Sequence, residues 1–159
     1  MKRLYISQTL ILAVGVLFSW YTAVNDFIRF YNTEGTIFKI KDCFFPNPVT
    51  TACFYGAIAF LVAFIWSVYI LKNKDAVKKE FHQTRLSWLL AAGTIFAWAN
   101  FANVLYKFYG TGSNIGCSGV PISSPFLTPC FYGSVIFLVS LIIALIIVKK
   151  DSAPKETSL

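Results

Sequence analysis

The chain has 159 residues, of which 57% are hydrophobic and only 13% are charged. Soluble domains carry about 25% charged residues, so this composition indicates a membrane protein, and the length suits a single domain over residues 1–159. The net charge of +7 does not indicate nucleic-acid binding, because the basic residues lie between and beside apolar runs rather than on one polar face.

Four apolar runs cover residues 4–24, 53–71, 86–106 and 130–148, and none of them contains Asp, Glu, Lys or Arg. Each run can cross a hydrocarbon core of about 30 Å as a helix that rises about 1.5 Å per residue. Helix is the default in lipid because the backbone must satisfy its own hydrogen bonds there. We therefore predict an all-α integral membrane fold with four transmembrane helices.

The two halves of the sequence resemble each other. Cys-Phe-Tyr-Gly occurs twice, at residues 53–56 and 130–133, and each copy opens an apolar run. Offsets of 78 and 77 residues align further identical residues, including Gly15 with Gly93, Phe18 with Phe96, Trp20 with Trp98, Asn25 with Asn103 and Pro48 with Pro125. This order of Trp, Asn, Pro and Gly predicts two helix-loop-helix repeats, at about 4–72 and 86–149. Both repeats enter the membrane in the same sense, which implies a pseudo-two-fold axis along the membrane normal.

Basic residues predict the orientation. Ten of the fourteen Lys and Arg lie at the N-terminus, in the middle loop 72–85 and in the tail from Lys149. The positive-inside rule therefore places both termini in the cytoplasm, with the loops 25–52 and 107–129 facing outward. We expect an integral protein of the bacterial plasma membrane with a flexible cytoplasmic tail at residues 151–159.

All four cysteines fall in the outward loops or at their ends. Two per loop, in an oxidising compartment, predict two disulfides, and four cysteines allow three connectivities. We predict Cys43–Cys53 and Cys117–Cys130, because each pair encloses a short segment with prolines that turn the chain back. The competing Cys53–Cys130 bridge would require the starts of two helices to touch.

The chain resembles the bacterial quinone-coupled disulfide-forming membrane enzymes and the related vitamin K epoxide reductases in three features. These are four helices, both termini inside and a cysteine pair in each outer loop. The resemblance implies a thiol–disulfide oxidoreductase that uses a quinone, but it covers topology and cysteine placement only and assigns no catalytic residue. If the cysteines are redox-active, the catalytic candidates are Cys43, Cys53, Cys117 and Cys130. Those families carry a reactive Cys-x-x-Cys, whereas the spacings here are Cys-x9-Cys and Cys-x12-Cys. Widely spaced pairs favour structural bridges over exchange.

Aromatic residues gather at the outer helix ends, where they form either an interfacial belt or a pocket for a flat apolar ligand. Two asparagines lie in the same region, and their amides either join helices by hydrogen bonds or orient a ligand. The pocket candidates are Phe54, Tyr55, Trp98, Asn100, Asn103, Phe131 and Tyr132.

No metal-ligand spacing, phosphate-binding loop or serine nucleophile signature is present in the sequence, and no cofactor is predicted outside the quinone alternative. The favoured function is non-catalytic. Disulfide-stapled outer loops would bind a protein partner or an apolar, lipid-like molecule at the outer membrane interface. The alternative is the quinone-coupled oxidoreductase, and the oligomeric state is left open.

Overall fold

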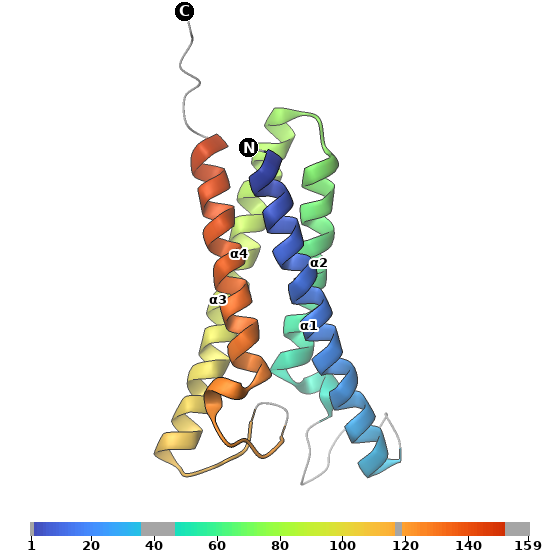
Figure 1. The fold of residues 1–159 in the computed structure, drawn as a ribbon, viewed down its shortest axis with the longest axis vertical. Coiled ribbons are helices and arrows are strands. Elements are labelled where there is room, and N and C mark those ends of the chain that lie inside the picture. The colour runs from blue at the N-terminus through green and yellow to red at the C-terminus, as the bar shows by residue number, and fades with distance from the viewer. Residues whose placement is uncertain (1, 36–46, 117–118, 152–159) are drawn as a thin grey trace, which may run out of the picture.

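The computed structural model describes residues 2–35, 47–116 and 119–151. Four long helices and two short 3-10 turns account for most of this part of the chain (Figure 1), and it contains no β-strand beyond one isolated bridge between Ile115 and Pro121. The elements are α1 (Lys2–Glu34), η1 (Pro48–Thr50), α2 (Ala52–Lys72), α3 (Ala76–Gly110), η2 (Pro125–Leu127) and α4 (Pro129–Asp151).

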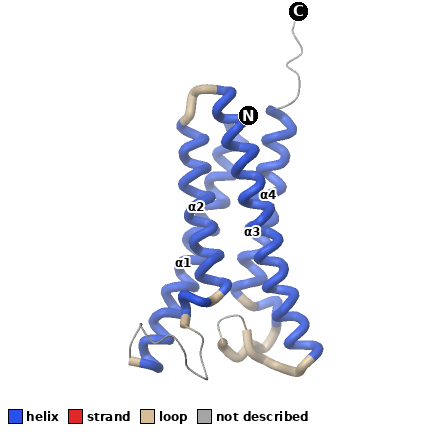
Figure 2. Tube along the Cα trace, turned by 180° about the vertical axis from the view of Figure 1, so that it is seen from behind, coloured by secondary structure: helices blue, strands red, loops and turns tan. Residues whose placement is uncertain are grey.

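All four long helices have the length and apolar composition needed to cross a membrane, as expected of an integral membrane protein. They form an up-and-down bundle in which α1 contacts α2 and α4, and α3 contacts the same two helices. Figures 1 and 2 show the N-terminus and the end of α4 at one end of the bundle, and the end of α1, the start of α2, the end of α3 and the start of α4 at the other. We call these the terminus end and the loop end.

Two helices extend well beyond the predicted apolar runs. Helix α1 continues from Val24 to Glu34, and α3 begins at Ala76 rather than at residue 86. The connection between α2 and α3 is therefore only residues 73–75, and most of the predicted middle loop forms the first turns of α3. The Asp75 side chain caps this start by accepting hydrogen bonds from the amides of Val77 and Lys78.

The two helices that begin at the loop end start in the same way. A Pro-led 3-10 turn precedes each one, and the following threonine, Thr51 or Thr128, is buried. The Thr51 hydroxyl accepts from the amide of Phe54, and the Thr128 hydroxyl accepts from the amide of Phe131, each over 3.4 Å. These caps fix where α2 and α4 begin, and they set a cysteine in the first turn of each.

Polar side chains connect the helices near the terminus end. Gln83 Nε2 donates to Gln8 Oε1 over 2.9 Å, which joins α3 to α1 across the diagonal of the bundle, and both side chains are buried. The hydroxyls of Thr9 and Ser67 lie 2.6 Å apart and join α1 to α2. Hydrogen bonds between buried side chains of different helices contribute about 0.6–2 kcal/mol in membranes, so this end of the bundle is held more tightly by polar contacts.

Candidate functional site

A cavity lies between the two helix pairs, toward the loop end. The space that it leaves for water-sized molecules is about 50 Å³, and its total empty volume, which counts the gaps between atoms and the open space at its mouth, is about 480 Å³. Both pairs, α1–α2 and α3–α4, contribute to its wall. The lining residues are Phe18, Ser19, Thr22, Ala52, Cys53, Gly56, Phe60, Phe96, Ala97, Asn100, Pro129, Cys130, Gly133, Ser134 and Phe137.

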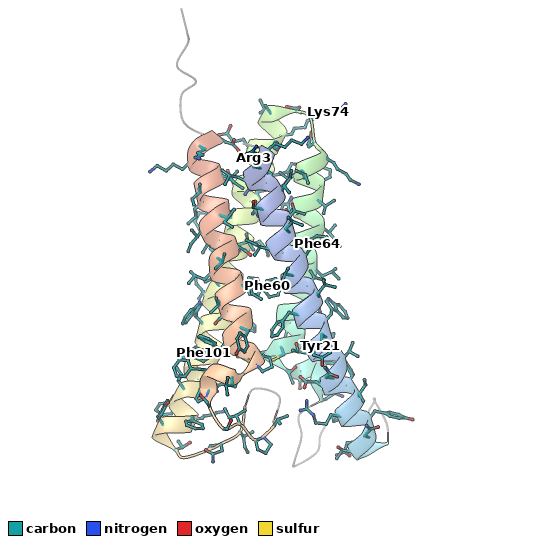
Figure 3. The ribbon with its side chains drawn as sticks, in the orientation of Figure 1. Arg3, Tyr21, Phe60, Phe64, Lys74 and Phe101 are labelled. Carbon is teal, nitrogen blue, oxygen red and sulfur yellow. The ribbon has the colours of Figure 1, made fainter. Side chains whose placement is uncertain are left out.

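Two stacked phenylalanines close the cavity toward the middle of the bundle. The ring centroids of Phe60 and Phe137 lie 3.8 Å apart with an angle of 21° between the planes. Both rings are buried, and Figure 3 shows Phe60 inside the bundle about halfway along its length. Each ring packs on a glycine of the neighbouring helix, because a Cβ at Gly15 would lie 2.6 Å from Phe60 and a Cβ at Gly93 would lie 2.7 Å from Phe137. Glycine at both positions therefore permits the neighbouring helices to pack closely.

Almost the whole lining consists of residues that the offsets of 77 and 78 align. Every lining residue except Ser134 has its aligned counterpart in the same wall. The pairs are Phe18 with Phe96, Ser19 with Ala97, Thr22 with Asn100, Ala52 with Pro129, Cys53 with Cys130, Gly56 with Gly133 and Phe60 with Phe137. A molecule in the cavity would therefore contact aligned residues from both halves of the chain.

Two cysteine sulfurs meet at this cavity. Cys53 Sγ and Cys130 Sγ lie 3.7 Å apart, so the starts of α2 and α4 do approach each other. The separation exceeds the S–S length of about 2.05 Å, and the described cysteines therefore include no pair at disulfide distance. Cys43 and Cys117 lie outside the described residues. The predicted pairing of Cys43 with Cys53 and of Cys117 with Cys130 remains a prediction.

The predicted aromatic residues surround the cavity without lining it. Phe54 packs edge-on against Phe27, and Phe131 packs against Phe101 and Phe126. The other three, Tyr55, Trp98 and Tyr132, are each exposed at 37% or more. Exposed aromatic rings at a helix end suit a membrane interface.

The two predicted asparagines occupy different surroundings. Asn100 lines the cavity, and its Nδ2 donates over 2.8 Å to the carbonyl of Phe96 in its own helix. Asn103 is exposed and lies in a second hollow at the mouth, which Asn100 also lines. The structure thus brings both amides to the mouth and shows no hydrogen bond from Asn100 to another described helix.

Sequence reasoning missed four phenylalanines of the wall as ligand contacts: Phe18, Phe60, Phe96 and Phe137. A signal for them exists, because the repeat alignment matches Phe18 with Phe96 and Phe60 with Phe137. A stripe of aligned aromatic residues facing another helix marks an interior surface more directly than aromatic residues at a helix end.

No protein-family model, curated protein or solved structure matches the chain. Within the described ranges, no group of three or more His, Cys, Asp or Glu side chains could hold a metal ion. The chemistry of the site therefore follows from its own apolar wall, its two sulfurs and the amides at its mouth.

Proposed function

We propose that the protein binds an apolar, lipid-like molecule in the cavity between the two helix pairs. The apolar wall carries this proposal, because the space that the two helix pairs leave toward the loop end is lined almost entirely by apolar groups. A hollow with an apolar wall remains dry when empty and accepts apolar guests. A small molecule fits this feature better than a protein partner does, since a partner would need an extended surface rather than a concave pocket.

The proposal also includes two structural repeats and an orientation of the protein in the membrane. The aligned pairs in the wall support two repeats about a pseudo-two-fold axis, with the cavity on that axis. The excess of Lys and Arg at the terminus end supports a cytoplasmic location for both termini in a bacterial plasma membrane. The cavity then opens toward the outer leaflet, where lipid-like molecules are available, and binding needs no catalysis.

A substitution that fills the cavity tests this function. Gly133 lines the cavity and a Cβ added there meets nothing within 4 Å, so Gly133→Leu puts a side chain into the empty space. We expect the purified wild-type protein to carry an apolar molecule at about one per chain, and the variant to carry at least about tenfold less, because overlap with a bound ligand costs more than about 1.4 kcal/mol. Mass spectrometry of organic extracts measures the amount.

Val139→Leu is the matched control, since it enlarges a side chain of the same helix at a position that is 39% exposed and outside the cavity wall. Circular dichroism and thermal unfolding check that both variants fold. If Gly133→Leu folds and retains its ligand at the wild-type level, the cavity is not the binding site and the proposal fails.

The approach of two sulfurs favours a second candidate function. Cys53 Sγ and Cys130 Sγ meet at 3.7 Å beside an apolar cavity, which supports a thiol–disulfide oxidoreductase coupled to a quinone. Two thiols that form a disulfide lose two electrons and two protons, and a quinone that becomes a quinol takes up both. The apolar wall would hold the quinone, and thiol–disulfide exchange would then pass oxidising equivalents among the four cysteines.

Peptide mapping without reduction separates the two functions. For the binding protein, we expect linked peptides Cys43–Cys53 and Cys117–Cys130 with a reduction potential below about −300 mV, as structural disulfides have. A peptide that links Cys53 to Cys130, or quinone-dependent oxidation of reduced protein that Cys53→Ser abolishes, would instead select the oxidoreductase. Reduced wild-type protein incubated without quinone controls for air oxidation.

A further inference from the structure

We propose that the molecule bound in the cavity is an anionic membrane lipid, with its apolar part inside the cavity and its phosphate headgroup on Lys107. This inference rests on the proposed binding function and adds the charge class of the ligand. It follows from a difference between the two halves of the protein at the mouth of the cavity.

Two hollows flank that mouth. The hollow on the α3 side has an empty volume of about 830 Å³, open space included, and it shares Ala52 and Asn100 with the cavity wall. A molecule in the cavity can therefore extend into this hollow without leaving the protein surface. Its lining residues are Thr50, Thr51, Ala52, Asn100, Asn103, Val104, Lys107, Ile115, Gly116 and Gly119.

The hollow on the α1 side has an empty volume of about 450 Å³ and is built from the corresponding positions of the other half. Its wall contains Asp26, Arg29, Leu127, Thr128 and Pro129, which the offsets of 78 and 77 align with Val104, Lys107, Thr50, Thr51 and Ala52 of the first hollow. Gly116 contributes to both hollows and therefore lies between them.

The charges of the two hollows differ. On the α1 side, Arg29 forms an ion pair with Asp26 over 2.9 Å, which neutralises the cation. On the α3 side, valine stands at the position aligned with Asp26, and Lys107 forms no ion pair in the part of the chain that the structure describes. The exposed Lys107 ammonium is therefore left to attract an anion from solution or from the membrane surface.

The neighbours of Lys107 suit a phosphate group. The Asn103 amide is exposed in the same hollow, and Asn100 uses one of its two N–H groups for Phe96, which leaves the other for a ligand. Amide and ammonium donors around one anion give charge-assisted hydrogen bonds, which are stronger than neutral ones. Because this hollow opens from an apolar cavity, the complementary ligand is an amphiphile with a negative head.

Lipid titration of the full chain in detergent tests the inference. The probes are dioleoyl phosphatidylglycerol, which is anionic, and dioleoyl phosphatidylcholine, which has the same chains and no net charge. Native mass spectrometry gives the affinity of each. We expect the wild-type protein to bind the anionic lipid about fivefold to tenfold more tightly, the effect of one basic residue on an anionic headgroup. Lys107→Gln should remove this preference, because it should weaken binding of phosphatidylglycerol more than binding of phosphatidylcholine, whose choline cation already offsets its phosphate.

Arg29→Gln is the matched control because it removes a cation at the aligned position that already has a carboxylate partner, and it should keep the preference. Glycerol 3-phosphate, a headgroup without chains, should not displace the lipid, whereas displacement would indicate a site for free phosphate. Equal affinities for the two lipids in the wild-type protein, or equal effects of Lys107→Gln and Arg29→Gln, would overturn the inference.

Gly133→Leu separates this inference from the function on which it rests. If that variant loses both lipids while Lys107→Gln and Arg29→Gln behave alike, the cavity binds lipid without selecting charge. If Gly133→Leu binds both lipids as the wild type does, the lipids lie elsewhere on the protein and the proposed function itself fails.

Discussion

A fragment that ends at Asp75 is expected not to fold as a monomer. It contains α1 and α2, but each of these helices also packs against the other half, α1 on α4 and α2 on α3. Removing the second half exposes the face of Phe60 that stacks on Phe137 and leaves the buried amide of Gln8 without Gln83. In lipid or detergent, helix association depends on such close packing and on hydrogen bonds between helices. The α1–α2 fragment would lose the packing and hydrogen bonds that α3 and α4 supply.

Far-ultraviolet circular dichroism and size-exclusion chromatography of residues 1–75 in detergent measure the outcome. The matched control co-expresses residues 1–75 with residues 76–159, which cuts the chain between the 73–75 connection and α3, so that the second fragment lacks only the Asp75 cap of α3 and keeps the full span of every helix. We expect the two fragments to assemble and to recover the unfolding temperature of the whole chain to within several degrees. A monomeric first half with native helicity would show that the halves fold independently.

The number of helices was predictable from the sequence because lipid imposes a simple condition on the chain. A charge-free run of about 20 residues must form a helix in a bilayer, and the sequence has four such runs. The helix ends were harder to predict because an apolar run marks contact with lipid and not the extent of helix. Residues 25–34 continue α1 as a polar helix, with Asp26 and Arg29 paired along its surface, and α1 ends before Gly35 with its positive φ of 67°.

The site was only partly predictable, because its walls come from different helices. Local spacing indicated that each cysteine pairs within its own loop, and it could not show that Cys53 and Cys130 approach each other across the bundle. That distance depends on how α2 and α4 pack. Their packing depends in turn on the Phe60–Phe137 stack and on Gly15 and Gly93, which lie against the two rings. The alignment of the two halves held the needed information, since it pairs Cys53 with Cys130 and Phe60 with Phe137, and both pairs lie in contact in the structure.

Replacing the glycines behind the phenylalanine stack is expected to destabilise the protein although alanine favours helix. Gly15→Ala places a methyl carbon 2.6 Å from Phe60, and Gly93→Ala places one 2.7 Å from Phe137, so one helix must move away or the stacked rings must shift. Overpacking of this kind costs about 1–3 kcal/mol, which exceeds the gain of up to about 1 kcal/mol from the higher helix propensity of alanine. Thermal or denaturant unfolding in detergent should show both single variants less stable than the wild type.

Gly56→Ala is the matched control, since a Cβ there meets nothing within 4 Å and the change should be neutral or stabilising by up to about 1 kcal/mol. The double variant Gly15→Ala/Gly93→Ala should lose more than the sum of the single losses. Both methyl groups crowd the same pair of stacked rings, whose centroids are already 3.8 Å apart, so the two changes compete for the same room to adjust. Adding Phe60→Leu to Gly15→Ala should recover part of the loss, because a smaller side chain leaves room for the methyl group. If Gly15→Ala is as stable as Gly56→Ala, the helices tolerate wider spacing and the stack does not determine the distance between the two halves.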